Sequence, residues 1–210
     1  MKANLLPLAK EGINYFLISL SLFSLCLVFD FDFLAFIAFF ATLFVSFSFR
    51  NPERELAIFE NGSLLSPADG IVQSITELDN DEYAYKIEIQ SSCTDVGVLR
   101  IPTHAKVSSV IKSNGSRLSS DSKLYSSLNE NAVIVFTTQE ENIFKVVHRL
   151  QRSFAPLFIE LTQEQNVVQT TRYGMMLNGT TTIYLPQNFR LNIKVGSQLK
   201  ASESLMGYFS

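Results

Sequence analysis

The feature that most constrains this chain is an apolar segment near its N-terminus, residues 13–49, which carries only two charged side chains. Eleven of the 18 phenylalanines precede residue 50. The two charged residues, Asp30 and Asp32, divide the segment into apolar runs at 13–29 and 34–49. Each run is close to the lower limit of about 17 residues for a helix that spans a bilayer. The segment is therefore predicted to lie in a membrane rather than in the core of a soluble domain.

The two aspartates predict where this segment turns. One continuous span would bury both carboxylates near the middle of the bilayer, at a cost of about 2.5–3.5 kcal/mol each. A turn at Asp30-Phe31-Asp32 avoids that cost. We therefore predict a helical hairpin, which either spans the membrane twice or enters and leaves as a re-entrant loop. A cleaved signal peptide and a buried globular hairpin are the alternatives, but a signal peptide has one shorter apolar core and a small-residue cleavage site.

Basic residues flank the hairpin on both sides and predict its orientation. Lys2 and Lys10 precede it, and Arg50 and Arg54 follow it. Because positive flanks stay in the cytoplasm, both ends of the hairpin are expected there. The predicted localisation is the cell membrane, with the globular domain on the cytoplasmic side.

The period of the sequence changes after Pro52, which predicts two domains: a membrane-anchoring hairpin at 1–54 and a β domain at 55–210. Short β-rich runs separated by Asn-Gly and Asp-Gly turn signals are typical of an all-β sandwich or barrel. No long amphipathic helix is evident in this part of the chain. The expected strands lie at 70–75, 83–90, 96–101, 132–138, 143–148, 157–161, 181–185 and 191–195.

Two stretches of this β domain, 66–72 and 195–205, look like the halves of a barrel-sandwich hybrid, the shape of lipoyl and biotinyl domains. Those carrier domains present a modified lysine on a hairpin turn, and no lysine here sits on such a turn. The predicted fold is therefore mainly β, a barrel-sandwich-hybrid-like domain behind a transmembrane or re-entrant hairpin, without a carrier function.

Charge and composition exclude several other classes. The chain has 17 Lys and Arg against 20 Asp and Glu, so its net charge is −3 and it lacks the basic surface of a nucleic-acid binder. With 47% hydrophobic residues it is not a disordered chain. Cys26 lies in the apolar segment and Cys93 in the β domain, so we expect no disulfide between them. Two His and two Cys without suitable spacing predict no zinc site.

Four short motifs lie in order along nearly the whole chain, at residues 49–54, 66–70, 95–102 and 172–186. They resemble those of the short bacterial phosphatidylserine decarboxylases. Phe-Arg-Asn-Pro-Glu-Arg at 49–54 is similar to their Phe-Arg-Asp-Pro-Glu-Arg, and Ser-Pro-Ala-Asp-Gly at 66–70 is identical to their box. Residues 95–102 resemble Asp-Val-His-Val-Asn-Arg-x-Pro. Residues 172–186 resemble Arg-x-Gly-Met-Ile followed by Leu-Tyr-Leu-Pro.

The resemblance implies a membrane enzyme that converts phosphatidylserine to phosphatidylethanolamine and CO₂ in phospholipid biosynthesis. In that family, a serine after glycine attacks the glycine carbonyl and the chain splits, which leaves a pyruvoyl group on the new N-terminus. The ketone forms a Schiff base with the substrate amine and accepts electrons as CO₂ leaves. An Asp–His pair assists the self-cleavage, as a general base would.

At the cleavage motif this chain departs from the family, whose Phe-Gly-Ser-Arg becomes Asn178-Gly179-Thr180-Thr181. Counting forward from Gly174 places Thr180 at the nucleophile, which would leave a 2-oxobutanoyl group in place of pyruvoyl. Counting backward from Pro186 places Gly179 there, and then no nucleophile exists. Both counts stay open, and a hairpin role for Thr180 is the structural alternative.

The base of the family also changes. The motif histidine is Gly97 here, so Asp69 is the member of the catalytic set that is retained. Asp69 in Ala-Asp-Gly is either a general base or a turn residue. His104, seven residues after Gly97, is a candidate displaced substitute, and His148 falls in an expected strand without a partner that the sequence identifies.

The site predicted by the resemblance is thus Asp69, Gly179 and Thr180, with Thr180 as the precursor of the keto-acyl cofactor and no metal. The function is a phosphatidylserine decarboxylase whose activity is weakened or lost. The alternative is a non-catalytic, membrane-anchored paralogue that binds lipid headgroups or an active partner. The expected partner is membrane phospholipid, and a homo-oligomer or a complex with an active paralogue stays open.

Overall fold

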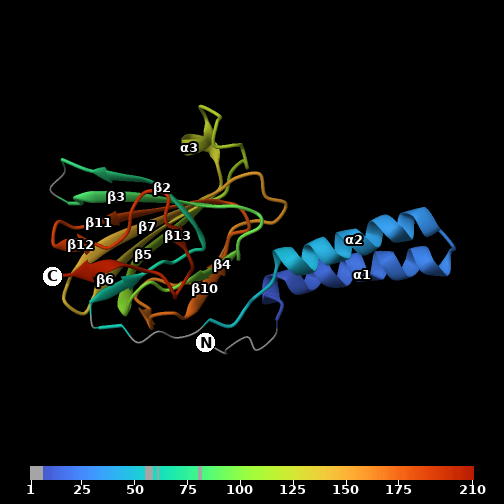
Figure 1. The fold of residues 1–210 in the computed structure, drawn as a ribbon, viewed down its shortest axis with the longest axis horizontal. Helices are drawn as coiled ribbons and strands as arrows, with labels where there is room; N and C mark the ends of the chain where they lie inside the picture. The colour runs from blue at the N-terminus through green and yellow to red at the C-terminus, as the bar shows by residue number, and fades with distance from the viewer. Residues whose placement is uncertain (1–6, 55–58, 61, 80–81) are drawn as a thin grey trace. The chain divides into compact units, whose positions relative to one another are not determined.

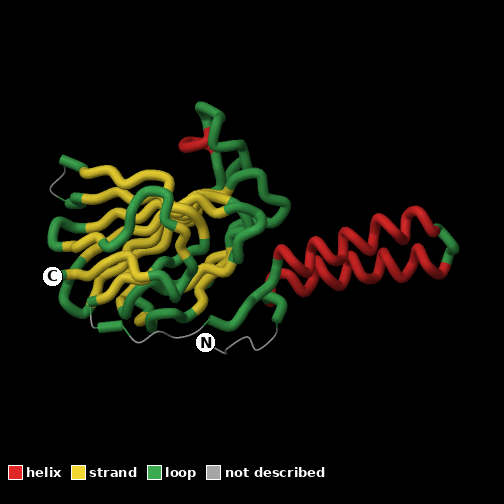
Figure 2. The backbone as a smooth tube through the Cα atoms, in the orientation of Figure 1, coloured by secondary structure: helices red, strands yellow, loops and turns green. Residues whose placement is uncertain are grey.

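The computed structural model describes residues 7–54, 59–60, 62–79 and 82–210. The chain divides into two compact units, Met1–Glu53 and Arg54–Ser210. Helices form the first unit, and strands and loops dominate the second (Figure 2). Both cysteines are free thiols.

The first unit is a helical hairpin. A short 3-10 helix, η1 (Lys10–Gly12), leads into α1 (Ile13–Val28), and α2 (Asp32–Ser48) runs back beside it (Figure 1). The turn between the helices contains Asp30 in a left-handed conformation, with φ 54°, which Asp tolerates better than most residues. Asp32 opens α2, where a negative charge is favourable next to the positive end of the helix dipole. The predicted hairpin and its turn at the two aspartates are confirmed.

The two helices pack through small side chains and leave large apolar ones outside. Cys26, Ala35, Ala38 and Thr42 are buried, and Phe23 and Phe39 lie with ring centroids 5.7 Å apart. The exposed residues include most of the leucines and phenylalanines of both helices. Small residues at a helix contact with apolar ones facing outward are typical of helices in lipid. Among the described residues, one helix, Lys10–Val28, is long and apolar enough to cross a membrane, whereas α2 is apolar but shorter.

The second unit consists of antiparallel sheets, in agreement with the predicted mainly β class. Within the described residues, one sheet has eight strands and two have three. The eight-stranded sheet runs in the order β13 (Gln198–Leu199), β2 (Gly70–Glu77), β3 (Tyr85–Ser91), β11 (Gly179–Leu185), β7 (Ile143–Leu150), β6 (Asn131–Thr138), β5 (Ala105–Ser113) and β9 (Asn166–Val167). The small sheets are β1 (Ser63–Leu65), β14 (Leu205–Phe209) and β12 (Phe189–Leu191), and β4 (Val98–Arg100), β10 (Arg172–Met175) and β8 (Phe158–Ile159).

The core of this unit lies on one face of the large sheet. Alternate residues of β6, namely Ala132, Ile134 and Phe136, are fully buried, as the period of two requires. Phe144 on β7 stacks on Phe136 with centroids 5.0 Å apart. The same alternation places successive residues of β11 on opposite faces, which matters for the cleavage motif.

The expected strands differ from the observed ones at several places, and β1, β5, β10 and β14 were not expected. The run at 191–195 was expected to be a strand, but β12 ends at Leu191. The chain turns there because Gly196 adopts φ 85° and the Ser197 amide donates to the Lys194 carbonyl. Sequence patterns also missed β5, whose apolar alternation is interrupted at a bulge between Val107 and Ser109. The short α3 (Tyr125–Leu128) is the one α-helix among the described residues of this unit.

Candidate functional site

Three of the motifs meet in the second unit. The Ser91 hydroxyl donates to the Asp69 carbonyl at 2.6 Å, and Ser91 lies directly opposite Gly179 across β3 and β11. From Ser91 the chain continues to Gly97, whose carbonyl accepts the Met176 amide at 2.7 Å. The fold therefore brings Asp69, Gly97 and the Gly179–Thr180 bond into one region, although they are far apart in sequence.

The two stretches that look like barrel-sandwich halves lie against each other. The Ser66 amide donates to the Ser204 carbonyl at 2.9 Å, and the Ser202 amide donates to the Ser66 carbonyl at 3.0 Å. Leu199 pairs with Gly70 where β13 meets β2. These bonds fix the Ser-Pro-Ala-Asp-Gly box against the C-terminal stretch and so position Asp69.

The Asp69 carboxylate is held by an ion pair and a backbone amide. Its Oδ2 lies 2.6 Å from Nη2 of Arg54, and its Oδ1 accepts the Ala201 amide at 2.8 Å. Arg54 also reaches Glu203, with Nη1 and Oε1 3.3 Å apart. The side chains of Arg54 and Asp69 are only 8% and 11% exposed. No hydrogen bond among the described residues joins this carboxylate to Gly179 or Thr180, and its partners are instead Arg54 and Ala201.

Further arginines surround this ion pair. The pKa of Arg100 is lowered, first by burial and then by the like charges of Arg54 and Arg172, while Asp69 and Glu203 oppose the shift. Sequence reasoning used Arg54 only as a flanking charge. Its position at the end of the 49–54 motif was the available signal for a structural partner of Asp69.

The Thr180 hydroxyl is held on the other side of the site by two side chains. Tyr125 Oη donates to Thr180 Oγ1 at 2.9 Å, and Thr180 Oγ1 donates to Gln90 Oε1 at 3.1 Å. The same Gln90 amide donates through Nε2 to the Gly179 carbonyl at 3.2 Å. Neither Tyr125 nor Gln90 was expected from the sequence, because strand pairing brings Gln90 to Thr180 and the distant segment with α3 brings Tyr125 there.

Gly179 has no room for a side chain. A Cβ atom at this position would lie 2.3 Å from the Arg149 carbonyl oxygen and 2.7 Å from Met176 Sδ. Only glycine permits so close a backbone approach. The packing around residue 179 therefore requires glycine at this position, directly before Thr180.

At Gly97 the structure leaves a tight but adjustable space. A Cβ there would lie 3.0 Å from the Met176 carbonyl oxygen and 3.2 and 3.3 Å from atoms at the ends of Leu177 and Met175. These two side chains can move, but the Met176 carbonyl is backbone, so a larger residue requires that strand to shift by a few tenths of an ångström. Gly97, where the resemblance expects a histidine, therefore lies next to the motif at 178–181.

The fully buried His148 has partners that the sequence did not reveal. Its Nδ1 lies 2.9 Å from Thr181 Oγ1 and its Nε2 lies 2.5 Å from Tyr173 Oη. Burial lowers the pKa of His148 to about 3, so the ring is neutral at ordinary pH. Because neighbouring strand residues face opposite ways, Thr181 points to the core side and Thr180 to the other. His148 thus contacts the threonine next to the candidate nucleophile, on the wrong face to serve it.

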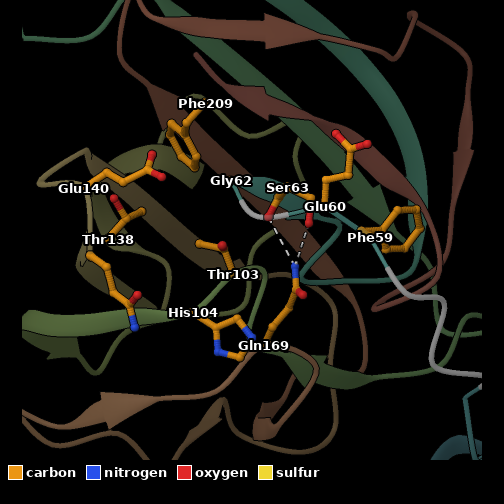
Figure 3. A pocket seen from close by; sticks show the side chains of 11 residues that line it. Phe59, Glu60, Gly62, Ser63, Thr103, His104, Thr138, Glu140, Gln169 and Phe209 are labelled. Carbon is orange, nitrogen blue, oxygen red and sulfur yellow. Dashed lines mark hydrogen bonds between the residues drawn. The ribbon is translucent and has the colours of Figure 1, made fainter.

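His104, the other candidate substitute, lines a separate pocket of about 350 Å³ (Figure 3). Ser63, Glu60, Glu140 and Gln169 also line it, and Gln169 Nε2 donates to the carbonyl and hydroxyl oxygens of Ser63. None of Asp69, Gly97, Gly179 and Thr180 is in its lining. The geometry offers no support for His104 at the cleavage motif. Within the described part of the chain, no cluster of His, Cys, Asp or Glu side chains could hold a metal ion.

Comparison with known proteins agrees with the motifs. The family profile described as phosphatidylserine decarboxylase matches residues 41–207. The chain is 30% identical to a protein named phosphatidylserine decarboxylase proenzyme from Desulfotalea psychrophila, over 96% of both chains. It is 32% identical to one of the same name from Syntrophus aciditrophicus, over 96% of this chain and 97% of the relative. A third, from Geotalea daltonii, is 26% identical over 99% of both.

Matches over nearly the whole length, together with four motifs of which three meet in one region, leave a single assignment. This chain belongs to the phosphatidylserine decarboxylase family.

Proposed function

We propose that the chain is a phosphatidylserine decarboxylase that matures by slow self-cleavage between Gly179 and Thr180. The observation that carries the proposal is the Thr180 hydroxyl, held beside the Gly179 carbonyl where the motifs meet. Its relatives are named proenzymes, which implies a group made from the chain itself. The substrate would be phosphatidylserine and the products phosphatidylethanolamine and CO₂.

The residues present fit the precursor of a keto-acyl group. Thr180 supplies a hydroxyl, and Gly179 supplies a carbonyl that a hydrogen-bond donor already contacts. From threonine the group would be 2-oxobutanoyl rather than pyruvoyl. Once formed, it would supply the ketone that binds the substrate amine and accepts electrons as CO₂ leaves. In this proposal Asp69 orients the Ser-Pro-Ala-Asp-Gly box through Arg54 and Ala201 and does not take the Thr180 proton.

Slow maturation is expected because no imidazole faces the nucleophile. General acid–base catalysis contributes about 10²- to 10⁴-fold to a rate, and the family's histidine is Gly97 here. The same observation favours a second candidate, a non-catalytic paralogue that binds lipid headgroups or an active partner chain. A homo-oligomer fits either candidate.

The first unit would hold the enzyme at its substrate. The apolar outer surface of α1 and α2 favours a lipid environment, and basic residues flank the hairpin. We propose that both ends of the hairpin and the domain at 55–210 lie on the cytoplasmic side of the cell membrane. We also propose a barrel-sandwich-hybrid topology for this domain, supported by the pairing of the Ser66 and Ser204 stretches.

Self-cleavage is tested on the full chain in detergent micelles by intact-mass spectrometry. We expect fragments of residues 1–179 and 180–210, the second with a ketone at its N-terminus that reacts with a hydrazide. Thr180→Val should leave the chain intact, because it removes the hydroxyl and keeps the shape. Thr180→Ser should cleave faster, because the β-methyl that crowds the attack is gone.

The decarboxylase proposal also needs turnover. Cleaved protein should release CO₂ from vesicles that contain phosphatidylserine, and the Thr180→Val variant should not. A wild-type chain that stays intact under all conditions contradicts the proposal and supports the non-catalytic paralogue.

Restoring the imidazole gives a separate expectation. Gly97→His should raise the rate of self-cleavage at least tenfold, which is below the roughly 10²-fold lower limit for a general base because Leu177, Met175 and the Met176 backbone must shift. The measurement is the fraction of cleaved chain against time, compared with Gly97→Asn as a control of polar character that cannot act as a base. Equal rates for the two variants would show that position 97 does not serve the nucleophile.

A further inference from the structure

The carboxamide of Gln90 contacts both the hydroxyl that must attack and the oxygen of the carbonyl that it must attack. Gln90 lies directly opposite Thr180 in the antiparallel pair of β3 and β11, so the two side chains share one face of the sheet. Its Oε1 accepts from Thr180 Oγ1 at 3.1 Å, and its Nε2 donates to the Gly179 carbonyl at 3.2 Å. Nε2 also donates to the Ser91 carbonyl at 3.1 Å, which fixes the plane of the amide.

Both contacts favour an acyl shift from the Thr180 nitrogen to its hydroxyl oxygen. The hydroxyl has to be aimed at the carbonyl carbon, and negative charge develops on the carbonyl oxygen as the bond forms. A donor placed on that oxygen stabilises the charge, as in oxyanion holes. Among side chains, a primary amide offers a strong acceptor and a strong donor side by side in one rigid group.

We propose that Gln90 is a positioning residue for the self-cleavage, holding the Thr180 hydroxyl against the Gly179 carbonyl and stabilising that carbonyl oxygen during the attack. The inference rests on the proposed function and names groups that assist the attack without acting as a base.

Tyr125 completes the arrangement. Its hydroxyl donates to Thr180 Oγ1 at 2.9 Å, so the single proton of Thr180 is left to point at Gln90. Burial raises the pKa of Tyr125, which keeps the phenol protonated as a donor. The Arg149 guanidinium lies 5.6 Å from the centre of the Tyr125 ring and packs the ring in place.

The step balances within the chain. Thr180 Oγ1 bonds to the carbonyl carbon of Gly179, the bond from that carbon to the Thr180 nitrogen breaks, and the hydroxyl proton ends on that nitrogen. The product is an ester isomer of the peptide, so the shift needs no co-reactant. Elimination of the ester then frees residues 1–179 as a carboxylate and leaves an unsaturated amine at residue 180. Water hydrolyses the imine form of this amine, so that the nitrogen of residue 180 leaves as ammonia and a ketone remains.

The test follows cleavage of newly made full-length chain in the presence of phospholipid vesicles. Gln90→Met keeps the size of the side chain and removes both contacts, and it should slow cleavage at least tenfold, since one oxyanion donor is worth about 10²- to 10³-fold. Tyr125→Phe should slow it several-fold. Gln73→Met, at an exposed position of the neighbouring β2, is the matched control and should cleave at the wild-type rate.

Gln90→Glu provides a second measurement, the pH dependence of the cleavage rate, which would not change if Gln90 only stabilised the fold. Its carboxylate keeps the acceptor for Thr180 and loses the donor for Gly179, so cleavage relative to wild type should be slow at pH 8. At pH 4, below the ordinary glutamic acid pKa of about 4.3, a protonated carboxyl regains an O–H donor, and the rate relative to wild type should recover. If Gln90→Met lacks the β-sheet circular dichroism of the wild type and is therefore misfolded, the test relies on Gln90→Glu alone.

The outcomes separate this inference from the proposed function. If the wild type cleaves and both Gln90 variants cleave at its rate at every pH, the role of Gln90 is overturned and the decarboxylase proposal stands. If the wild type never cleaves, both are overturned. Slow cleavage of Gln90→Met with pH-dependent recovery of Gln90→Glu supports the inference.

Discussion

Acidification is expected to destabilise the β unit by about 1.4 kcal/mol per pH unit below pH 6.5, because one histidine cannot take up a proton while it is buried. His148 is fully buried between Thr181 and Tyr173, and its pKa is lowered to about 3. Below pH 6.5 the unfolded chain binds a proton at this ring and the folded chain does not. Stability is therefore complete above pH 6.5 and declines as the pH falls toward 3.

Urea unfolding of the full chain in micelles, followed by the far-ultraviolet circular dichroism of the strands, measures this decline between pH 8 and 5. His148→Gln should be less stable at pH 7 and should lose the slope between pH 6.5 and 5. The chain has only two histidines, so His104→Gln is the matched control and should keep the wild-type slope. The same slope in wild type and His148→Gln would contradict the assignment.

Breaking the buried ion pair between Arg54 and Asp69 should also lower the free energy of unfolding strongly. Arg54→Met leaves the Asp69 carboxylate buried without its cation, and loss of one partner of a buried pair costs about 3–5 kcal/mol. With side-chain exposures of 8% and 11%, water screens the pair little. The measurement is the free energy of unfolding from urea titration at pH 7.5.

Two further variants isolate the pair from general damage. Asp69→Asn combined with Arg54→Met should be more stable than the sum of the single losses predicts, because no lone charge stays buried. Lys106→Met breaks the exposed ion pair with Glu164 and should cost less than about 1 kcal/mol. Equal costs for Arg54→Met and Lys106→Met would mean that the Asp69 pair does not stabilise the box.

The hairpin is an example of structure that local sequence alone predicts. Asp30 and Asp32 predict the turn because charge is costly inside an apolar run, and that rule needs no knowledge of distant residues. Long alternating runs such as those in β6 and β7 are likewise local. The sequence pattern did not predict β5, because a bulge interrupts its alternation of apolar and polar residues. It wrongly predicted a strand after Leu191, because a turn at Gly196 ends an otherwise alternating run.

The candidate site divides in the same way. Asp69, Gly97, Gly179 and Thr180 stand out by resemblance, since short motifs keep their order. Gln90, Tyr125 and His148 do not, because each contacts the cleavage motif across strand pairs or from a distant loop. The ion pair between Arg54 and Asp69 could be suspected only from two motifs that meet in space.

By itself the sequence determined the apolar hairpin and its turn, the mainly β class of the remainder and the family. These depend on residue type and spacing along the chain. Only the tertiary structure decided which face of β11 each threonine occupies, and therefore that Thr180 meets Gln90 and Tyr125 while Thr181 meets His148. The reason is physical: a shift of one residue in strand register exchanges the two faces, and the register is set by the packing of the whole sheet.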